Sequence, residues 1–243
     1  EILSRLVSSH RPMTATELAE TMGLHQSTVS RILGTLQGTG FVRKPDYHSF
    51  APDYGLLTFA RGAIHHFDLI QASEPLFRKE APRCSPLCLS LATIWRSEVL
   101  YLIHQTPPAF FHIVPLNYHP VHLSSPGLRI LLEYPEAEAL HCLDESRRTM
   151  GWKRPTPKVP STAREVLRTA RALLDLDVLI LEGWNSPTDM TAAIPIRSGG
   201  KIVAAGALYG ERGSFPKDRV TALLQHLGRE IEAGLLVLPR NVS

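Results

Sequence analysis

Hydrophobic and polar positions near the start of the chain predict two short helices. Apolar residues within positions 2–7 recur with the spacing of one helix face, and Pro12 disfavours helical geometry in the residue before it. A second helix begins at Thr14, which together with Glu17 forms a capping-box pattern. We expect this helix to end at Gly23, because glycine readily adopts the left-handed conformation of a helix C-terminus.

A third helix follows after a short connection. Its apolar residues recur at the spacing of one helical face, and they are Val29, Ile32, Leu33 and Leu36. Its opposite face carries small or hydrogen-bonding residues and one arginine, namely Ser27, Ser30, Arg31, Gly34 and Thr35. Two helices joined by a tight turn predict a helix-turn-helix, whose second helix enters the major groove of DNA.

The next residues predict a β-hairpin, or wing. A short strand over 41–44 and a return strand over 49–51 flank a turn that contains Pro45. Residues 25–50 contain three basic and one acidic side chain, whereas residues 1–24 contain two basic and three acidic ones. The positive side is therefore the third helix and the wing. The candidate DNA-contacting residues are Thr14, Gln26, Ser27, Thr28, Ser30, Arg31, Arg43, Lys44 and His48.

The remainder of the chain alternates between helical and strand patterns. Thr162 and Glu165 form a second capping-box pattern ahead of an apolar helix, and residues 220–231 repeat the helical spacing. Two alternating strands surround a turn at Arg96–Ser97. These patterns predict an α+β fold in which helices pack on an antiparallel sheet.

Composition and charge narrow the class of protein without naming a function. The 243 residues are 44% hydrophobic, and a formal net charge of +3 is too small to indicate nucleic acid or membrane by itself. Three cysteines make no even disulfide framework, and no apolar run reaches the roughly 18 residues of a membrane span. We therefore expect a cytoplasmic protein with no membrane partner. The helical pattern at Glu1 leads us to expect further residues upstream.

A resemblance to the IclR family of bacterial transcription regulators is carried by three segments: ELAETMGLHQSTVSRILGTLQGTGFVRKPDYHSFAPDYGLLTFA, HLSSPGLRILL and DMTAAIPIRSGGKIVAAGALYG. The resemblance implies a winged helix-turn-helix over residues 1–52 and a linker helix over 53–69. It also implies a GAF-like effector-binding domain over 70–243, with an antiparallel sheet. A small-molecule effector, bound and not turned over, is then expected.

The effector pocket expected from the resemblance is built from a turn, two strands and the last hairpin. The candidate residues are Phe111, Ile113, Ser125, Gly127, Leu128, Trp184, Thr191, Ala193, Ala207 and Tyr209. Gly127 either lets the polar end of a ligand approach the backbone N–H groups of the following helix or serves the turn alone. Thr191 replaces a cysteine of many relatives, and Ala207 and Tyr209 replace serines. We expect a small anionic effector, an organic or aromatic acid.

Enzyme and metal functions have weaker support. The HPVH motif at 119–122 has a spacing that zinc sites use, but Pro120 prevents a helical presentation of the two histidines. Cys84 and Cys88 are either a redox pair or small buried hydrophobes. The sequence contains no G-x-S-x-G, P-loop, G-x-G-x-x-G or paired-carboxylate motif. We predict that the protein is not an enzyme and uses no metal or cofactor.

The sequence therefore predicts a transcriptional regulator whose affinity for double-stranded operator DNA is controlled by an effector. The alternative is a ligand-binding domain whose helix-turn-helix mediates protein association. One winged helix reads too few base pairs for genomic specificity, so we expect a palindromic operator bound by a homodimer or a dimer of dimers, a homotetramer. The candidate interface residues are Leu3, Leu6, Leu56, Leu57 and Phe59.

Overall fold

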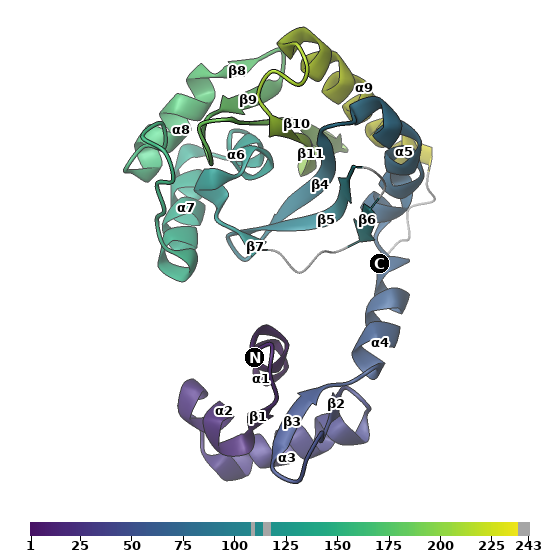
Figure 1. Cartoon of the computed structure of the whole chain (residues 1–243), viewed down its shortest axis with the longest axis vertical. Coiled ribbons are helices and arrows are strands. Elements are labelled where there is room, and N and C mark those ends of the chain that lie inside the picture. Colours follow the sequence, from purple (N-terminus) through teal and green to yellow (C-terminus); the bar gives the residue numbers. More distant parts are fainter. Residues whose placement is uncertain (108–109, 114–117, 238–243) are drawn as a thin grey trace. The chain divides into compact units, whose positions relative to one another are not determined.

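The computed structural model describes residues 1–107, 110–113 and 118–237, and for residues 110–113 and 118 it describes the backbone alone. The chain divides into two compact units, Glu1–Phe67 and Asp68–Ser243. Each unit is described by itself in the following paragraphs (Figure 1).

The first unit is a small helical domain with a three-stranded antiparallel sheet in the order β1-β3-β2. Its elements are α1 (Ile2–Ser8), β1 (Met13–Thr14), α2 (Ala15–Met22), α3 (Gln26–Gly38), β2 (Val42–Arg43), β3 (Ser49–Pro52) and α4 (Gly55–Ile64). The first three helices and the wing match the sequence prediction, whereas α4 is shorter than the linker helix expected over 53–69. The strand β1 was not predicted, because two residues are too few to show an alternating pattern.

The expected caps fix both ends of α2. The Thr14 hydroxyl accepts a hydrogen bond from the Glu17 amide at 3.1 Å, and the Glu17 carboxylate accepts one from the Thr14 amide at 2.7 Å. At the other end, Gly23 adopts a left-handed conformation with φ of 63°, and its N–H donates to the carbonyls of Ala19 and Glu20. These contacts set the turn that leads into α3.

The apolar stripe of α3 is narrower than predicted. Val29 and Leu33 are fully buried in the core of the first unit, whereas Ile32 is 36% exposed. Leu6 is 1% exposed and belongs to the same core, so the expectation that it forms an intermolecular interface is wrong. The side chain stabilises its own unit instead.

The second unit is built on an eight-stranded sheet, counted over the described residues, in which every pairing is antiparallel. Its strands are β4 (Cys88–Trp95), β5 (Glu98–Thr106), β6 (Phe110–Ile113), β7 (Tyr118–His119), β8 (Leu174–Asp175), β9 (Val178–Glu182), β10 (Asp189–Ser198) and β11 (Lys201–Glu211). The order is β6-β5-β4-β11-β10-β9-β8, and β7 pairs with β5.

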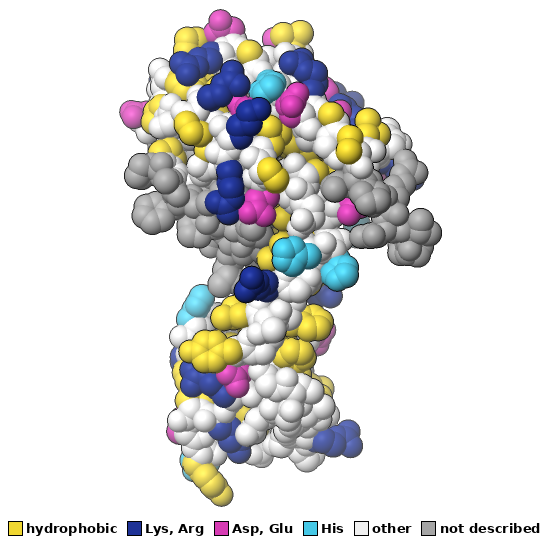
Figure 2. All heavy atoms as spheres, turned by 90° about the vertical axis from the view of Figure 1, so that its right-hand side faces the viewer, with side chains coloured by type: hydrophobic (Ala, Val, Ile, Leu, Met, Phe, Trp, Pro, Cys, Tyr) yellow, Lys and Arg dark blue, Asp and Glu magenta, His cyan; other side chains and the backbone are white. Residues whose placement is uncertain are grey.

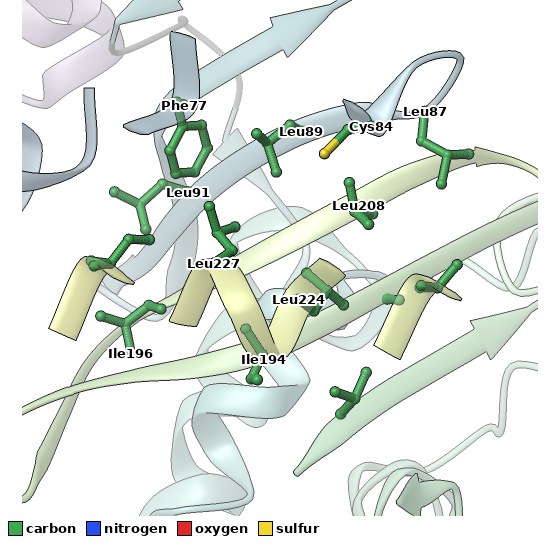
Figure 3. Close-up of a cluster of buried hydrophobic side chains, with 14 of the residues drawn as sticks. Phe77, Cys84, Leu87, Leu89, Leu91, Ile194, Ile196, Leu208, Leu224 and Leu227 are labelled. Carbon is green, nitrogen blue, oxygen red and sulfur yellow. The ribbon is translucent and has the colours of Figure 1, made fainter. Parts of the chain in front are cut away.

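Helices cover both faces of this sheet (Figure 1). The helices are α5 (Asp68–Cys84), η1 (Val121–Leu123), α6 (Ser125–Leu131), α7 (Glu136–Met150), α8 (Ala163–Ala172) and α9 (Lys217–Val237). One core joins Phe77 of α5 and Leu224 of α9 to Leu208 of the sheet (Figure 3). A second core joins α6, α7 and α8 to the opposite face, and Leu128 lies within it. The fold is α+β, as predicted.

A buried arginine ties α6 to the turn between β8 and β9. Arg129 is 1% exposed and pairs with Glu133 at 2.9 Å and with the carboxylate of Asp177. Arg197 of β10 pairs with the same two carboxylates, at 2.9 Å and 2.8 Å. Burial acts to raise the pKa of Glu133 and of Asp177, but the two guanidinium groups outweigh it and hold both pKa values below the usual range.

None of the described helices is long and apolar enough to cross a membrane.

Candidate functional site

A groove of about 450 Å³ lies in the first unit, between the start of α2, the exposed face of α3 and the wing. Its described lining is rich in hydroxyl and amide groups, contains one lysine and contains no carboxylate. Polar lining residues include Thr14, Thr16, Gln26, Ser30, Gln37, Lys44, Tyr47 and His48. Such groups form hydrogen bonds with base edges and phosphates. Because the described lining contains no carboxylate, it does not repel the phosphates of DNA.

The groove brings together five of the nine predicted DNA-contacting residues. These are Thr14, Gln26, Ser30, Lys44 and His48. The other four lie outside its lining, although Ser27, Arg31 and Arg43 are exposed and Thr28 is half-buried. The predicted set therefore covers the groove and its surroundings.

The wing is shaped by one carboxylate. Asp46 accepts hydrogen bonds from the Ser49 hydroxyl at 2.5 Å and from the amides of His48 and Ser49 at 2.9 Å and 2.8 Å. These bonds, the Ser49 hydroxyl first, hold the pKa of Asp46 below its usual range. The turn presents Tyr47 with 85% of its surface exposed, and Lys44 Nζ lies 6.0 Å from its ring centre.

Sequence reasoning missed Tyr47 as a functional candidate. An aromatic residue between the two strands of a polar wing was the available signal, because an exposed aromatic ring without a core to fill can serve in binding. The structure places Tyr47 in the lining of the groove, next to the predicted residue His48.

A second cavity, of about 280 Å³, lies in the second unit between the sheet and the segment that leads into α6. The floor of the cavity is formed by residues that the strand register places next to one another. Thr191 is opposite Tyr209, Ala207 is opposite Ser90, and Ser90 is opposite His104. These residues lie on the sheet face opposite the α9 core, since side chains alternate along a strand. The rest of the lining comes from Tyr101, His119, Leu123, Ser124, Ser125, Pro126, Asn185 and Leu208.

Two hydroxyl groups in this cavity are buried without a hydrogen-bond partner among the described residues. They belong to Ser125, which is 1% exposed, and to Thr191, which is 6% exposed. Buried polar atoms are nearly always paired, because an unpaired hydroxyl in a protein interior loses its hydration without compensation. Both hydroxyls are therefore available to a small molecule in the cavity.

The described lining of the cavity carries no permanent charge. No lysine, arginine, aspartate or glutamate occurs among its described lining residues. Burial raises the pKa of Tyr101, against a hydrogen bond with Ser124, and burial lowers the pKa of His119, so both side chains are uncharged. The described lining therefore offers no permanent positive charge to the anionic effector that the sequence predicts.

Four of the ten predicted effector residues line this cavity: Ser125, Thr191, Ala207 and Tyr209. Four others do not. Leu128 and Ala193 are fully buried in the packing of the unit. Trp184 is 2% exposed, and its indole N–H donates to the His122 carbonyl at 2.9 Å, so it is a core residue. The side chains of Phe111 and Ile113 lie outside the described residues.

Gly127 has a packing role that the sequence did not reveal. A Cβ atom at this position would lie 2.6 Å from Val99 Cγ2 and 3.2 Å from Val121 Cγ1. The Gly127 N–H is also used internally, since it donates to Ser124 Oγ at 3.2 Å. This N–H is therefore not free to bind a ligand. A glycine is required at position 127 because the backbone packs closely against β5.

Sequence reasoning also missed several cavity residues, chiefly Tyr101, His104, His119 and Asn185. His119 was considered only as part of a metal motif. Its neighbour in that motif, His122, stacks on Trp152 with ring centres 4.0 Å apart and hydrogen-bonds through Nε2 to the Lys153 carbonyl at 2.9 Å. Among the described residues, no group of three or more His, Cys, Asp or Glu side chains could hold a metal ion.

Comparison with known proteins agrees with this geometry. Residues 1–46 match the model of the IclR helix-turn-helix domain. No curated protein matches the chain. Among solved structures, an IclR homologue from Microbacterium hydrocarbonoxydans, complexed with 4-hydroxybenzoate, is 21% identical with a TM-score of 0.75, and 98% of each chain is covered.

Two further solved structures are similar over nearly the whole chain. An IclR transcriptional regulator from Alicyclobacillus acidocaldarius is 20% identical with a TM-score of 0.76, and the match covers 96% of this chain and 97% of that one. An IclR-family regulator from Brucella abortus is 21% identical with a TM-score of 0.77, over 98% and 89% of the two chains. At these identities the likeness establishes the fold.

Proposed function

We propose that this chain, which has an IclR helix-turn-helix domain in residues 1–46 and the fold of IclR-family transcriptional regulators, is a DNA-binding regulator controlled by a small organic or aromatic acid. The observation that carries the proposal is the groove beside α3, whose described lining is polar and free of carboxylates. A regulator of bacterial transcription acts where the chromosome lies, so we assign the protein to the cytoplasm.

In this proposal α3 enters the major groove of operator DNA. Gln26 and Ser30 then lie near base edges, where an amide pairs with adenine and a hydroxyl with any base. Arg43 and Lys44 on the wing supply contacts with phosphates that do not depend on sequence. Arg31, exposed on the same helix, contacts either a base or a phosphate.

The cavity of the second unit is the proposed effector site. The IclR homologue from Microbacterium hydrocarbonoxydans is complexed with 4-hydroxybenzoate, which supports an aromatic acid as the ligand class for this chain. The unpaired hydroxyls of Ser125 and Thr191 offer hydrogen bonds to the polar end of such a molecule. We assign binding to this site and no turnover.

An effector changes DNA affinity only if it binds the DNA-competent and DNA-incompetent states of the protein with different affinities. Such couplings typically amount to about 1–3 kcal/mol, and operator DNA must change the affinity for the effector by the same factor. We place α4, the last helix of the first unit, in the role of the linker helix through which this coupling passes.

The DNA-binding half of the proposal is tested by selecting duplexes from a random pool with the full chain. The dissociation constant of the best duplex is then measured across a series of KCl concentrations. We expect enrichment of a palindrome and a steep loss of affinity with salt, because phosphate contacts release counterions. A protein whose helix-turn-helix only mediates protein association would enrich no sequence and show no such dependence.

The effector half is tested by a thermal-shift screen of small aliphatic and aromatic carboxylic acids. A ligand that binds only the folded state raises the melting temperature, by an amount that grows with its concentration relative to its dissociation constant. If no acid raised the melting temperature, the assigned ligand class would be wrong. The DNA-binding assignment would be unaffected, because the duplex selection tests it separately.

A further inference from the structure

The lining of the cavity poses an electrostatic problem for any acid. A carboxylate that leaves water for a protein interior loses its hydration, and this cost is severe unless a positive charge or several donors replace the water. The described lining supplies hydroxyls, an amide and two imidazoles, and no lysine or arginine. The imidazoles of His104 and His119 are thus the groups of the described lining that can gain a positive charge near neutral pH.

His119 is the better placed of the two to accept a proton. Its Nδ1 lies 3.4 Å from the Pro120 carbonyl, and because a carbonyl oxygen can only accept, Nδ1 carries the hydrogen of this contact. Nε2 is then the basic nitrogen of the neutral ring. The side chain is half-buried in the cavity wall at the end of β7.

The groups around His119 keep its ring neutral until an anion arrives. Burial lowers its pKa most, the hydrogen bond with the Pro120 carbonyl acts against burial, and the positive charge of Lys153 lowers the pKa further. His122 faces it from η1 and is itself a neutral ring whose pKa burial lowers. From the sheet, Tyr101 of β5 and Tyr209 of β11 line the same cavity with their phenol groups. None of these described neighbours provides a carboxylate that would hold a proton on His119 before the ligand binds.

We propose that the cavity takes up a monocarboxylic acid together with one proton from solvent, and that His119 holds this proton beside the ligand carboxylate. The inference rests on the proposed effector site and specifies how that site accepts an acid. The bound pair of imidazolium and carboxylate has no net charge, so the neutral lining is preserved. The hydroxyls of Ser125 and Thr191 complete the hydrogen bonds of the carboxylate.

This arrangement makes acid binding depend on pH. Between the pKa that His119 has in the free protein and the higher pKa that it has in the complex, each unit of pH lowers the affinity for a carboxylate about tenfold, because one proton is taken up for each ligand bound. Below the pKa that His119 has in the free protein, the affinity becomes independent of pH until the ligand itself is protonated. A neutral amide of the same shape needs no proton and shows no such dependence.

The test is calorimetric titration of the full chain with 4-hydroxybenzoate and with 4-hydroxybenzamide between about pH 5.5 and 8.5, the range over which an imidazole titrates. Running each titration in buffers of different ionisation enthalpy counts the protons taken up. At pH values between those two pKa values we expect about one proton per benzoate bound, with affinity falling about tenfold per pH unit, and no proton for the amide.

Variants locate the proton. His119→Gln should remove both the proton uptake and the pH dependence of benzoate binding, whereas His141→Gln, an exposed histidine of α7, should leave both unchanged. If the uptake survived in His119→Gln and vanished in His104→Gln, the assignment to His119 would be overturned. Benzoate binding without proton uptake would overturn the inference as a whole.

The outcomes separate this inference from the proposed function. If the amide bound and the benzoate did not bind at any pH, the proton-coupled uptake would be wrong while control by a small molecule would stand. If neither probe bound at millimolar concentration, both the inference and the aromatic-acid class would be contradicted, and the duplex selection would still decide the DNA-binding role.

Discussion

The hydroxyl of Thr191 has no hydrogen-bond partner among the described residues. It is buried on β10 with its Oγ1 unpaired, whereas the Thr93 hydroxyl of β4 donates to the Val203 carbonyl at 3.0 Å. We predict that Thr191→Val leaves the free energy of unfolding unchanged or raises it by about 1 kcal/mol, and weakens effector binding about fivefold. Urea unfolding and ligand titration measure the two effects.

Thr93→Val is the matched control, because it removes a hydroxyl that is paired. It should lower the free energy of unfolding by about 1 kcal/mol and leave effector binding unchanged. If Thr191→Val were the less stable of the two variants, its hydroxyl would have a partner within the protein, and the argument for a ligand contact would fail.

Arg31 tests the DNA interface at the scale of one side chain. It is exposed on α3, so we predict that Arg31→Ala keeps the melting temperature and weakens binding to the selected duplex by about 1–3 kcal/mol. Arg168→Ala, an exposed arginine of α8 in the other unit, is the control and should bind as the wild type does. Equal affinities of the two variants for the duplex would argue against docking through this face of α3.

Sequence patterns and structure agree best where a single element carries the information. The capping box at Thr14 and the left-handed glycine after α2 are local signals, and each is present. The turn between β8 and β9 gave no such signal, because Leu176 and Asp177 adopt positive φ without being glycines. Local sequence signals predict regular elements and their ends, whereas unusual backbone conformations such as those of Leu176 and Asp177 depend on the surrounding tertiary structure.

The cavity was harder to predict than the elements around it. Its lining comes from segments that lie far apart in the sequence, and no local pattern states that Tyr101, His119 and Thr191 meet. Gly127 was expected either to admit a ligand or to serve the turn alone. Only the three-dimensional packing shows that Val99 of β5 fills the space beside it. Such contacts depend on packing between elements, which periodicity does not encode.

The N-terminal cap of α2 contributes to the stability of this helix. Thr14→Ala should destabilise α2 by about 1 kcal/mol, because the amide of Glu17 loses its acceptor, whereas Thr14→Ser keeps the acceptor and most of the stability. Amide hydrogen exchange of α2 measures this locally, since it reports the opening of single elements. Equal exchange in the two variants would show that the hydrogen bond contributes nothing.

The ion-pair network around Arg129 makes the packing of α6 against the sheet depend on pH. The pKa values of Asp177 and Glu133 are lowered in the folded state, so their stabilising contribution is present above their ordinary pKa values and is lost as pH falls through the lowered ones. We predict that the free energy of unfolding falls more steeply below about pH 4.5 in the wild type than in Asp177→Asn.

Urea unfolding at a series of acidic pH values measures this difference. Asparagine suits the test because it tolerates the positive φ of 69° at this position, and it removes the negative charge while keeping one of the two acceptor oxygens. A parallel decline in the two proteins would mean that the network does not govern acid stability.

At the scale of the whole molecule, the exposed apolar residues of the first unit point to self-association. No residue of α4 is buried, and Leu57 and Phe59 are 67% and 68% exposed. Figure 2 shows hydrophobic side chains gathered on the displayed surface of this unit. We predict a dimer at micromolar concentration by analytical ultracentrifugation, since paired recognition helices are needed to read a palindrome.

Leu57→Glu should shift this equilibrium toward the monomer while leaving the melting temperature of the monomer unchanged, because the side chain is exposed within its own chain. Leu173→Glu, an exposed leucine after α8, should leave the dimer intact. A monomeric wild type, or equal dissociation by both substitutions, would remove α4 from the interface.

Control of DNA binding by a ligand is the central claim, and one measurement addresses it directly. The dissociation constant of the full chain for its selected duplex is determined by fluorescence anisotropy, with and without a saturating concentration of the acid that most raises the melting temperature. The account predicts a change of about 5- to 150-fold in the wild type, and a smaller change in Thr191→Val when the acid concentration is set near the wild-type dissociation constant for the acid. An unchanged dissociation constant for the duplex, in a wild-type protein shown to bind both the acid and the DNA, would contradict it.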